Sequence, residues 1–274
     1  MITEVIEANL VSTYDGIIKT NLSDLVSGTD RLINPRVKLV KAQIPYTFYP
    51  IRAGTNGDNS DATNTIRIYH TDDGELSTTI PEGYYPTVTA LLTAMMTAIN
   101  SVTTTTTFSY TYDTVSGKTT ITCSSGAWYF QNTDASTASN FSIDNLFYLL
   151  GFEKIVGIGP ESASQTSVGV STISFDTSIE VNSALVNGYD NLSTSRPLKA
   201  INTNAFALIP VNCNFGQQIN YFSSESVSGW LRCGNLFTTI VLTLSDVFGT
   251  PLNLNYKLWT ATLAISYDVD SYTS

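Results

Sequence analysis

The sequence predicts a mainly β protein, in which two sheets pack face to face and a small α+β domain interrupts the strands. In several short segments apolar side chains alternate at a two-residue period, which is typical of strands with one buried face. Irregular loops and turn-forming residues separate these segments. Such strands bury their apolar faces when two sheets pack about 10 Å apart. Residues 76–155 contain a helical period instead.

The expected strands lie on both sides of that interruption. The closing segment has the most regular pattern, because its apolar residues occupy every second position: Trp259, Ala261, Leu263, Ile265 and Tyr267. We expect this strand to lie inside a sheet, with Trp259, Leu263 and Ile265 in the core between the sheets. The other expected strands span residues 36–45, 64–71, 171–183, 205–212 and 237–245.

Residues 76–155 predict a compact unit that begins with an amphipathic helix. Pro86 is well placed as the first helical residue, since that position needs no backbone N–H. The apolar residues that follow recur at helical spacing on one face: Val88, Leu91, Leu92, Met95 and Ile99. The run Thr103–Thr107 ends the helix, because β-branched residues favour extended chain.

A hairpin and a second helix complete the expected insert. The hairpin has a turn at residues 113–118, with Phe108, Tyr110 and Tyr112 before it and Thr119, Ile121 and Cys123 after it. In the second helix Ser142 is the N-cap, Gly151 follows the end, and one face is apolar: Ile143, Leu146, Phe147 and Leu150. We therefore expect a first β part at 1–75, an inserted domain at 76–155 and a second β part at 156–274.

The composition narrows the classes of function. The chain has 274 residues, of which 13% are charged and 42% hydrophobic, whereas ordinary globular domains have about 25% charged residues. This low charge predicts that other subunits, such as copies of the chain itself, cover much of the surface. The net charge of −10 would repel DNA and anionic membranes. The local exception is a basic cluster, interpreted either as a solvated strand or as a patch that faces a partner or the inside of a shell: Arg31, Arg36, Lys38 and Lys41.

No catalytic, cofactor or metal site is predicted. His70 is the one histidine, which excludes a zinc site built on several histidines. Because His70 lies where a strand leads into a turn, we interpret it as a surface or hydrogen-bonded histidine rather than a catalytic base. Residues 58–64 and 157–162 lack the spacing of a calcium loop and of a phosphate loop. A carboxylate pair for glycoside hydrolysis has no positive support.

The sequence also predicts where the chain is made. It shows neither a secretory signal nor an apolar run long enough for a transmembrane helix. Its three widely spaced cysteines, Cys123, Cys213 and Cys233, are expected to be reduced core residues of a protein made in the cytosol.

From about residue 36 to 267 the order of segments resembles the penton (minor vertex capsid) proteins of virophages, polinton-like viruses and large double-stranded DNA viruses. The most specific stretches are LGF at Leu150–Phe152 and LTLSDVFGTPLNLNYKLW at 242–259. Further segments in this order are QIPYTFYPI, NTIRI, TIPEGYY, ALLTAM, FSYTYDTVSGKTTIT, NLFYLLGF, IEVNSALV and ALIPVNCNFGQQINY. The turn after Asn255 departs from the family pattern, because Tyr256 and Lys257 replace the usual polar Gly or Asp.

The resemblance implies a single jelly-roll β-sandwich, upright in the shell, with an inserted domain that points outward. Five copies would close around each icosahedral five-fold axis, beside the major capsid protein of a virion assembled in host cytoplasm. It implies a structural protein rather than an enzyme, with no specific nucleic acid as partner, and with a host-surface receptor as a candidate partner of the insert.

Two other functions stay open. The chain is alternatively a virion attachment or fibre-head protein that binds a host glycan through outer loops. In that case Tyr84, Tyr85 and Tyr189, which lie in turn-like segments, would stack on sugars, although local packing of these rings is the simpler interpretation. A β-sandwich enzyme of the glycosidase type is the third hypothesis.

Overall fold

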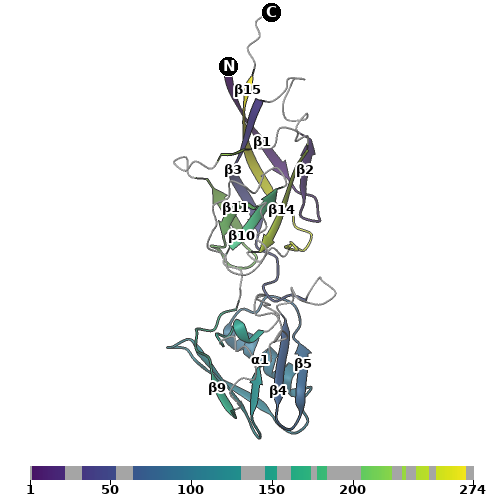
Figure 1. Cartoon of the computed structure of the whole chain (residues 1–274), viewed down its shortest axis with the longest axis vertical. Helices are drawn as coiled ribbons and strands as arrows, with labels where there is room; N and C mark the ends of the chain where they lie inside the picture. Colours follow the sequence, from purple (N-terminus) through teal and green to yellow (C-terminus); the bar gives the residue numbers. More distant parts are fainter. Residues whose placement is uncertain are drawn as a thin grey trace, which may run out of the picture. The chain divides into compact units, whose positions relative to one another are not determined.

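The computed structural model describes residues 2–21, 33–53, 64–130, 146–152, 162–173, 178–183, 205–223, 230–232, 239–246 and 251–269. The chain divides into two compact units (Figure 1). The first unit combines Met1–Phe48 with Asp176–Ser274, and the second unit is Tyr49–Phe175. Each unit has its own cluster of buried apolar residues.

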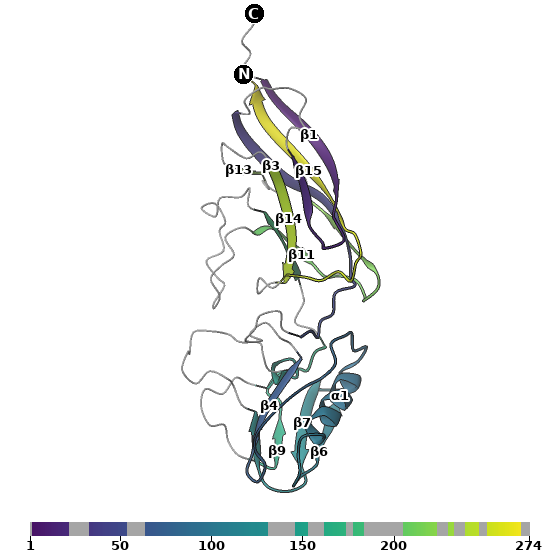
Figure 2. The same ribbon diagram turned by 90° about the vertical axis from the view of Figure 1, so that its right-hand side faces the viewer.

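Two antiparallel sheets form the first unit. The first sheet has the order β1 (Ile2–Val11), β15 (Thr260–Val269), β3 (Ile33–Pro45) and β12 (Gln218–Phe222), and β13 (Leu231–Arg232) also pairs with β3. The second sheet has the order β11 (Ala205–Pro210), β10 (Ser178–Ser183), β14 (Thr239–Asp246) and β2 (Ile18–Asn21). Apart from the short β13, these eight strands follow the order of a jelly roll. Figure 2 shows β1, β15 and β3 side by side as long curved strands.

The closing strand lies inside the first sheet, between β1 and β3. Its alternating apolar residues are buried as predicted: Trp259, Ala261, Leu263, Ile265 and Tyr267. The indole N–H of Trp259 donates to the carbonyl oxygen of Gly16 at 2.7 Å, and its backbone N–H donates to Oγ of Ser12 at 2.9 Å. These bonds join the start of β15 to the β1–β2 connection, so the predicted register is confirmed.

The turn before this strand has a left-handed backbone at two residues that are not glycine. Asn255 and Tyr256 have φ values of 51° and 61°, in the left-handed region that glycine, asparagine and aspartate tolerate best. The side chain of Asn255 donates to the carbonyl oxygen of Thr47, which holds the turn against the end of β3. The backbone conformation of Tyr256 is therefore strained, whereas the same conformation would not be strained for a glycine. The ring of Tyr256 is exposed.

Two small sheets and a helix form the second unit. One sheet has the order β5 (Gly74–Thr79), β4 (Thr65–His70) and β8 (Trp128–Phe130), and the other has the order β6 (Phe108–Asp113), β7 (Lys118–Cys123) and β9 (Ser164–Thr166). Helix α1 (Val88–Asn100) contacts β6 and β5 and lies along the β6–β7 hairpin in Figure 2. A group of aromatic rings fills the core of this unit: Phe108, Trp128, Phe130, Phe147 and Phe152.

The helix and the hairpin agree with the sequence prediction except at one boundary. The predicted helix face is buried at Leu91, Leu92, Met95 and Ile99, and the hairpin pairs Phe108 with Cys123, Tyr110 with Ile121 and Tyr112 with Thr119. Pro86, however, is not the first helical residue. Thr87 is the N-cap, because its Oγ1 accepts a hydrogen bond from the Ala90 N–H at 3.1 Å.

Among the described residues, the predicted second helix corresponds to a 3₁₀ turn, Leu146–Tyr148. Its expected N-cap Ser142 and the apolar Ile143 lie outside the described residues. Gly151 follows the turn with φ of 76°. A Cβ atom at Gly151 would lie 2.5 Å from the carbonyl carbon of Gly169, so the backbones of these two segments meet where neither residue has a side chain.

The second unit is wider than the expected insert at 76–155. Strand β4, which we expected in the first unit, pairs with β5 and with β8. The strand expected over 171–183 begins at Ser178, while Ser171 belongs to the second unit and donates to the carbonyl oxygen of Leu150 at 3.0 Å. Alternation marks a strand but does not identify the sheet that it joins, so the boundaries at 76 and 155 were too narrow.

Candidate functional site

The outer face of the first sheet carries small polar residues along its centre. On β15 the outward positions are Thr260, Thr262, Ala264, Ser266 and Asp268, which alternate with the buried core residues. Thr262 Oγ1 donates to Oδ1 of Asn9 on β1 at 2.7 Å. Because these side chains are short, the centre of the face has little relief and little charge, as is common at the centre of subunit interfaces.

Charged side chains stand on either side of this centre. The register places Glu7 of β1 and Lys38 of β3 in one row, with Ala264 between them. Along the same two strands, Arg36 lies beside Ser266 in the row before Lys38, and Lys41 lies beside Thr262 in the row after Lys38. The face therefore has an acidic side at β1 and a basic side at β3.

The flanks of the same face expose apolar side chains. On β1, Val5 is 58% exposed and Val11 is 60% exposed. On β12, Phe222 is 66% exposed, and Nζ of Lys41 lies 5.4 Å from the centre of its ring. A cation over an aromatic ring is held in place electrostatically, so Lys41 and Phe222 form a single surface element at the basic side.

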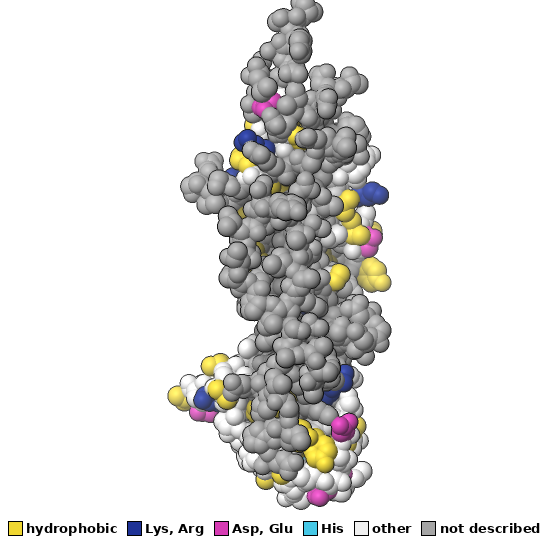
Figure 3. All heavy atoms as spheres, viewed as in Figure 1, with side chains coloured by type: hydrophobic (Ala, Val, Ile, Leu, Met, Phe, Trp, Pro, Cys, Tyr) yellow, Lys and Arg dark blue, Asp and Glu magenta, His cyan; other side chains and the backbone are white. Residues whose placement is uncertain are grey.

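The face drawn in Figure 3 shows few charged side chains among the described residues. Lysine, arginine, aspartate and glutamate side chains appear there in small patches among polar and apolar ones. This agrees with the charged fraction of 13% in the whole chain. Of the predicted basic cluster, Arg36, Lys38 and Lys41 lie together on β3, whereas Arg31 lies outside the described residues.

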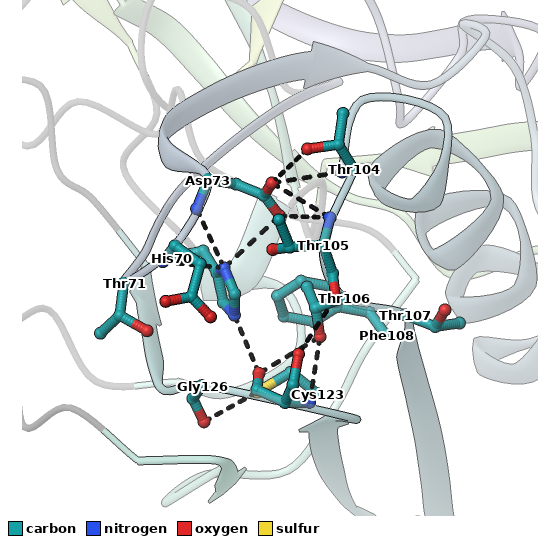
Figure 4. A network of polar contacts seen from close by, with 12 residues as sticks. His70, Thr71, Asp73, Thr104, Thr105, Thr106, Thr107, Phe108, Cys123 and Gly126 are labelled. Atoms are coloured by element: carbon teal, nitrogen blue, oxygen red, sulfur yellow. Dashed lines mark hydrogen bonds and ion pairs between the residues drawn. The ribbon is translucent and has the colours of Figure 1, made fainter.

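His70 is buried in a polar network of the second unit (Figure 4). Its Nε2 lies 2.9 Å from the carbonyl oxygen of Ser125, and a carbonyl can only accept, so Nε2 carries the proton. Nδ1 then accepts from the backbone N–H groups of Asp72 at 3.4 Å and Asp73 at 3.3 Å. The sequence predicted either a surface histidine or a hydrogen-bonded one, and His70 is the hydrogen-bonded one.

Asp73 connects the β4–β5 turn to the segment after α1. Its carboxylate accepts from Oγ1 of Thr104 at 2.6 Å and from the backbone N–H of Thr105 at 3.2 Å. The hydrogen bond from Thr104 is the main cause that lowers the pKa of Asp73, and the bonds from Thr105 add to it. Hydrogen bonds to the ionised form favour that form, so this carboxylate stays charged and holds two loops together.

Two further residues close this network. Gly126 has φ of 69°, and a Cβ atom there would lie 2.7 Å from Nε2 of His70, so the segment needs glycine. The Cys123 thiol is free and approaches the carbonyl oxygen of Gly126 at 3.5 Å. Burial raises the pKa of the Cys123 thiol and also that of Cys213, which makes both poor nucleophiles. Cys233 lies outside the described residues.

The other residues that the sequence analysis considered for ligand binding form no site among the described residues. Tyr84 and Tyr85 are partly buried, and the Tyr85 hydroxyl donates to the carbonyl oxygen of Pro81 at 2.8 Å. Tyr189 and most of 58–64 and 157–162 lie outside these ranges. Among the described residues, no three His, Cys, Asp or Glu side chains gather as metal ligands, and no helix is long and apolar enough to cross a bilayer.

No protein-family model and no curated protein matches the sequence. Among solved structures, the chain is similar to the crystal structure of the selenomethionine-labelled mavirus penton protein. The identity is 13% and the TM-score is 0.47, and the match covers 97% of this chain and 100% of the penton chain.

Proposed function

We propose that this protein is a structural capsid protein, a penton subunit that forms homopentamers at the five-fold vertices of an icosahedral virion. The observation that carries the proposal is the strand order β1-β15-β3-β12 and β11-β10-β14-β2, with a separate unit between β3 and β10. Viral capsid domains are one of the main classes built on double-sheet jelly rolls. The order of sequence segments, which resembles the penton family, supports the same role.

The first sheet offers a surface suited to assembly. The side chains at the centre of its outer face are short and mostly uncharged, and Val5, Val11 and Phe222 are exposed at its flanks. Closed cyclic symmetry is the common arrangement of identical subunits. The proposed role needs no catalysis, and the one histidine has both ring nitrogens bonded to backbone groups of its own unit.

The proposal places the chain in the virion, assembled in host cytoplasm, next to the major capsid protein. The second unit is the part that a vertex protein would present to a host-surface receptor, because the chain leaves the jelly roll after β3 and returns at β10. Neither specific nucleic-acid binding nor a membrane span belongs to this function.

Native mass spectrometry of the purified chain tests the proposal. We expect a closed pentamer at micromolar protein and moderate salt, with five-fold class averages by negative-stain microscopy. A trimer that binds glycans on an array would favour the attachment-protein alternative. Turnover of a glycan would instead indicate an enzyme, and a chain that stays monomeric even with the other shell proteins would contradict the vertex role.

A further inference from the structure

The outer face of the first sheet carries an acid and a base in one row. The row runs from Glu7 on β1 through Ala264 on β15 to Lys38 on β3. Glu7 is exposed and Lys38 is half-buried, and neither forms an ion pair among the described residues. They stand two strand spacings apart, about 10 Å, which is too far for a direct bond. A partner that pairs with both must present a base and an acid at the same spacing, and a second copy of this face does so.

A two-fold axis in the plane of the sheet can place this face on a copy of itself in two ways. With the axis across the strands, β1 lies on β1 and β3 lies on β3, so Lys38 of one copy meets Lys38 of the other. With the axis along β15, β1 of each copy lies on β3 of the other, and Glu7 meets Lys38 at two symmetric positions. Like charges brought together across an interface are costly, so the charges favour the axis along β15.

The neighbouring rows fit the same arrangement. Val5 shares a row with Arg36, and Asn9 shares a row with Lys41. Around an axis along β15, the exposed Val5 of one copy therefore covers the aliphatic part of Arg36 in the other, and Asn9 faces Lys41. The short side chains on β15 leave the two faces free to approach to about 10 Å, the usual spacing of packed sheets.

The size of this face predicts a weak contact. Strands β1 and β15 have 10 residues each. At the usual rise and strand spacing, three such strands cover roughly 500 Å² in each copy. A pair then buries about 1,000 Å², the lower limit for a specific interface, so we expect a dimer that depends on protein concentration.

We propose that two copies of this chain pair through the outer face of the first sheet, about a two-fold axis along β15, with Glu7 of each copy against Lys38 of the other. Such a contact is isologous, because both copies use the same patch. The inference goes beyond the proposed pentamer, since no two-fold axis relates the members of one five-fold ring. The contact joins free chains or chains of two different rings, and the ring itself uses other surfaces.

Glu7→Lys and Lys38→Glu test the pair in the intact chain. Each single variant places like charges together at both symmetric positions, so we expect the dissociation constant of the dimer to rise at least about fivefold. The double variant Glu7→Lys/Lys38→Glu should return to within about a factor of two of the parent, because both positions again join opposite charges. Sedimentation equilibrium over a concentration series measures the dissociation constant, and circular dichroism verifies folding.

An equimolar mixture of the two single variants tests the two-fold symmetry. In a mixed pair the two bases of the Glu7→Lys chain face the two acids of the Lys38→Glu chain, so both contacts are attractive. The mixture should therefore associate at least as tightly as the parent, although neither variant does so alone. Energy transfer between differently labelled variants measures the mixed pair. A mixture that stays as weak as its components would overturn the proposal.

Lys19→Glu is the matched control, since Lys19 is exposed on β2 of the other sheet and the charge change is the same. It should dimerise like the parent. Single variants that dimerise normally would contradict the contact, and so would single variants that the double variant does not rescue. A parent chain that stays monomeric, binds a labelled DNA duplex and loses that binding on Lys38→Glu would assign the face to nucleic acid instead.

The same series separates this inference from the proposed vertex role. Dimers that follow the charge changes, without pentamers even in the presence of the other shell proteins, would support the pair and contradict the vertex role. Pentamers without any association that responds to these charges would support the vertex role and contradict the pair.

Discussion

Trp259 is the residue on which the closing strand most depends. Its side chain is fully buried, and its indole N–H bonds to Gly16. We expect Trp259→Ala to lower the free energy of unfolding by about 3–5 kcal/mol, the usual cost of emptying a large aromatic site. Thr260→Ala, on the outward face of the same strand, should cost less than about 1 kcal/mol. Urea unfolding of both variants measures the difference, and equal midpoints would contradict the register of β15.

At the scale of elements, Asp73 joins the β4–β5 turn to the segment after α1. Hydrogen bonds from Thr104 and Thr105 lower the pKa of Asp73, so the folded state holds its proton more weakly than the unfolded state. The stabilisation is therefore present above the unfolded pKa of about 3.9 and is lost as the pH falls through the lower, folded pKa.

Asp73→Asn tests this link between the two elements. The variant should melt below the parent at pH 7, and the two melting temperatures should converge as the pH falls towards about 2. Asp72→Asn is the control, because Asp72 is exposed and the hydrogen bonds from Thr104 and Thr105 go to Asp73 instead. Scanning calorimetry between pH 2 and 7 measures both variants, and a melting difference independent of pH would show that the carboxylate charge is not the cause.

For the whole molecule, the two separate cores predict which deletion survives. Replacement of Tyr49–Phe175 by a short Gly/Ser linker should leave a soluble β protein, because the first unit keeps its own core. The change in linker length matters little, since the entropic cost of closing a loop grows only logarithmically with its length. A chain in which the same linker replaces residues 76–155 should instead aggregate. That change truncates β5 and removes β8, so both edges of β4 are left unpaired. Gel filtration and circular dichroism compare the two products. Equal solubility would contradict the unit boundaries.

Local periodicity was enough to locate most elements. Alternation at Trp259–Tyr267 and the helical spacing from Leu91 to Ile99 each predicted a buried face that the structure confirms. Both patterns depend on which side of one element faces the core, and sequence spacing determines that directly. The start of the helix differed by two residues, Val88 instead of Pro86, because Thr87 is the N-cap and its Oγ1 accepts a hydrogen bond from the Ala90 N–H.

Local periodicity could not predict which distant segments pair with one another. Ile66 and Ile68 are buried in the second unit rather than in the jelly roll, and no local property of β4 distinguishes the two cores. The His70 ring bonds to a carbonyl 55 residues away, and the row of Glu7, Ala264 and Lys38 brings together three strands from both ends of the chain. Side-chain period is a property of a single strand, whereas register and partner choice depend on how whole sheets pack, and these decide which charges share a face.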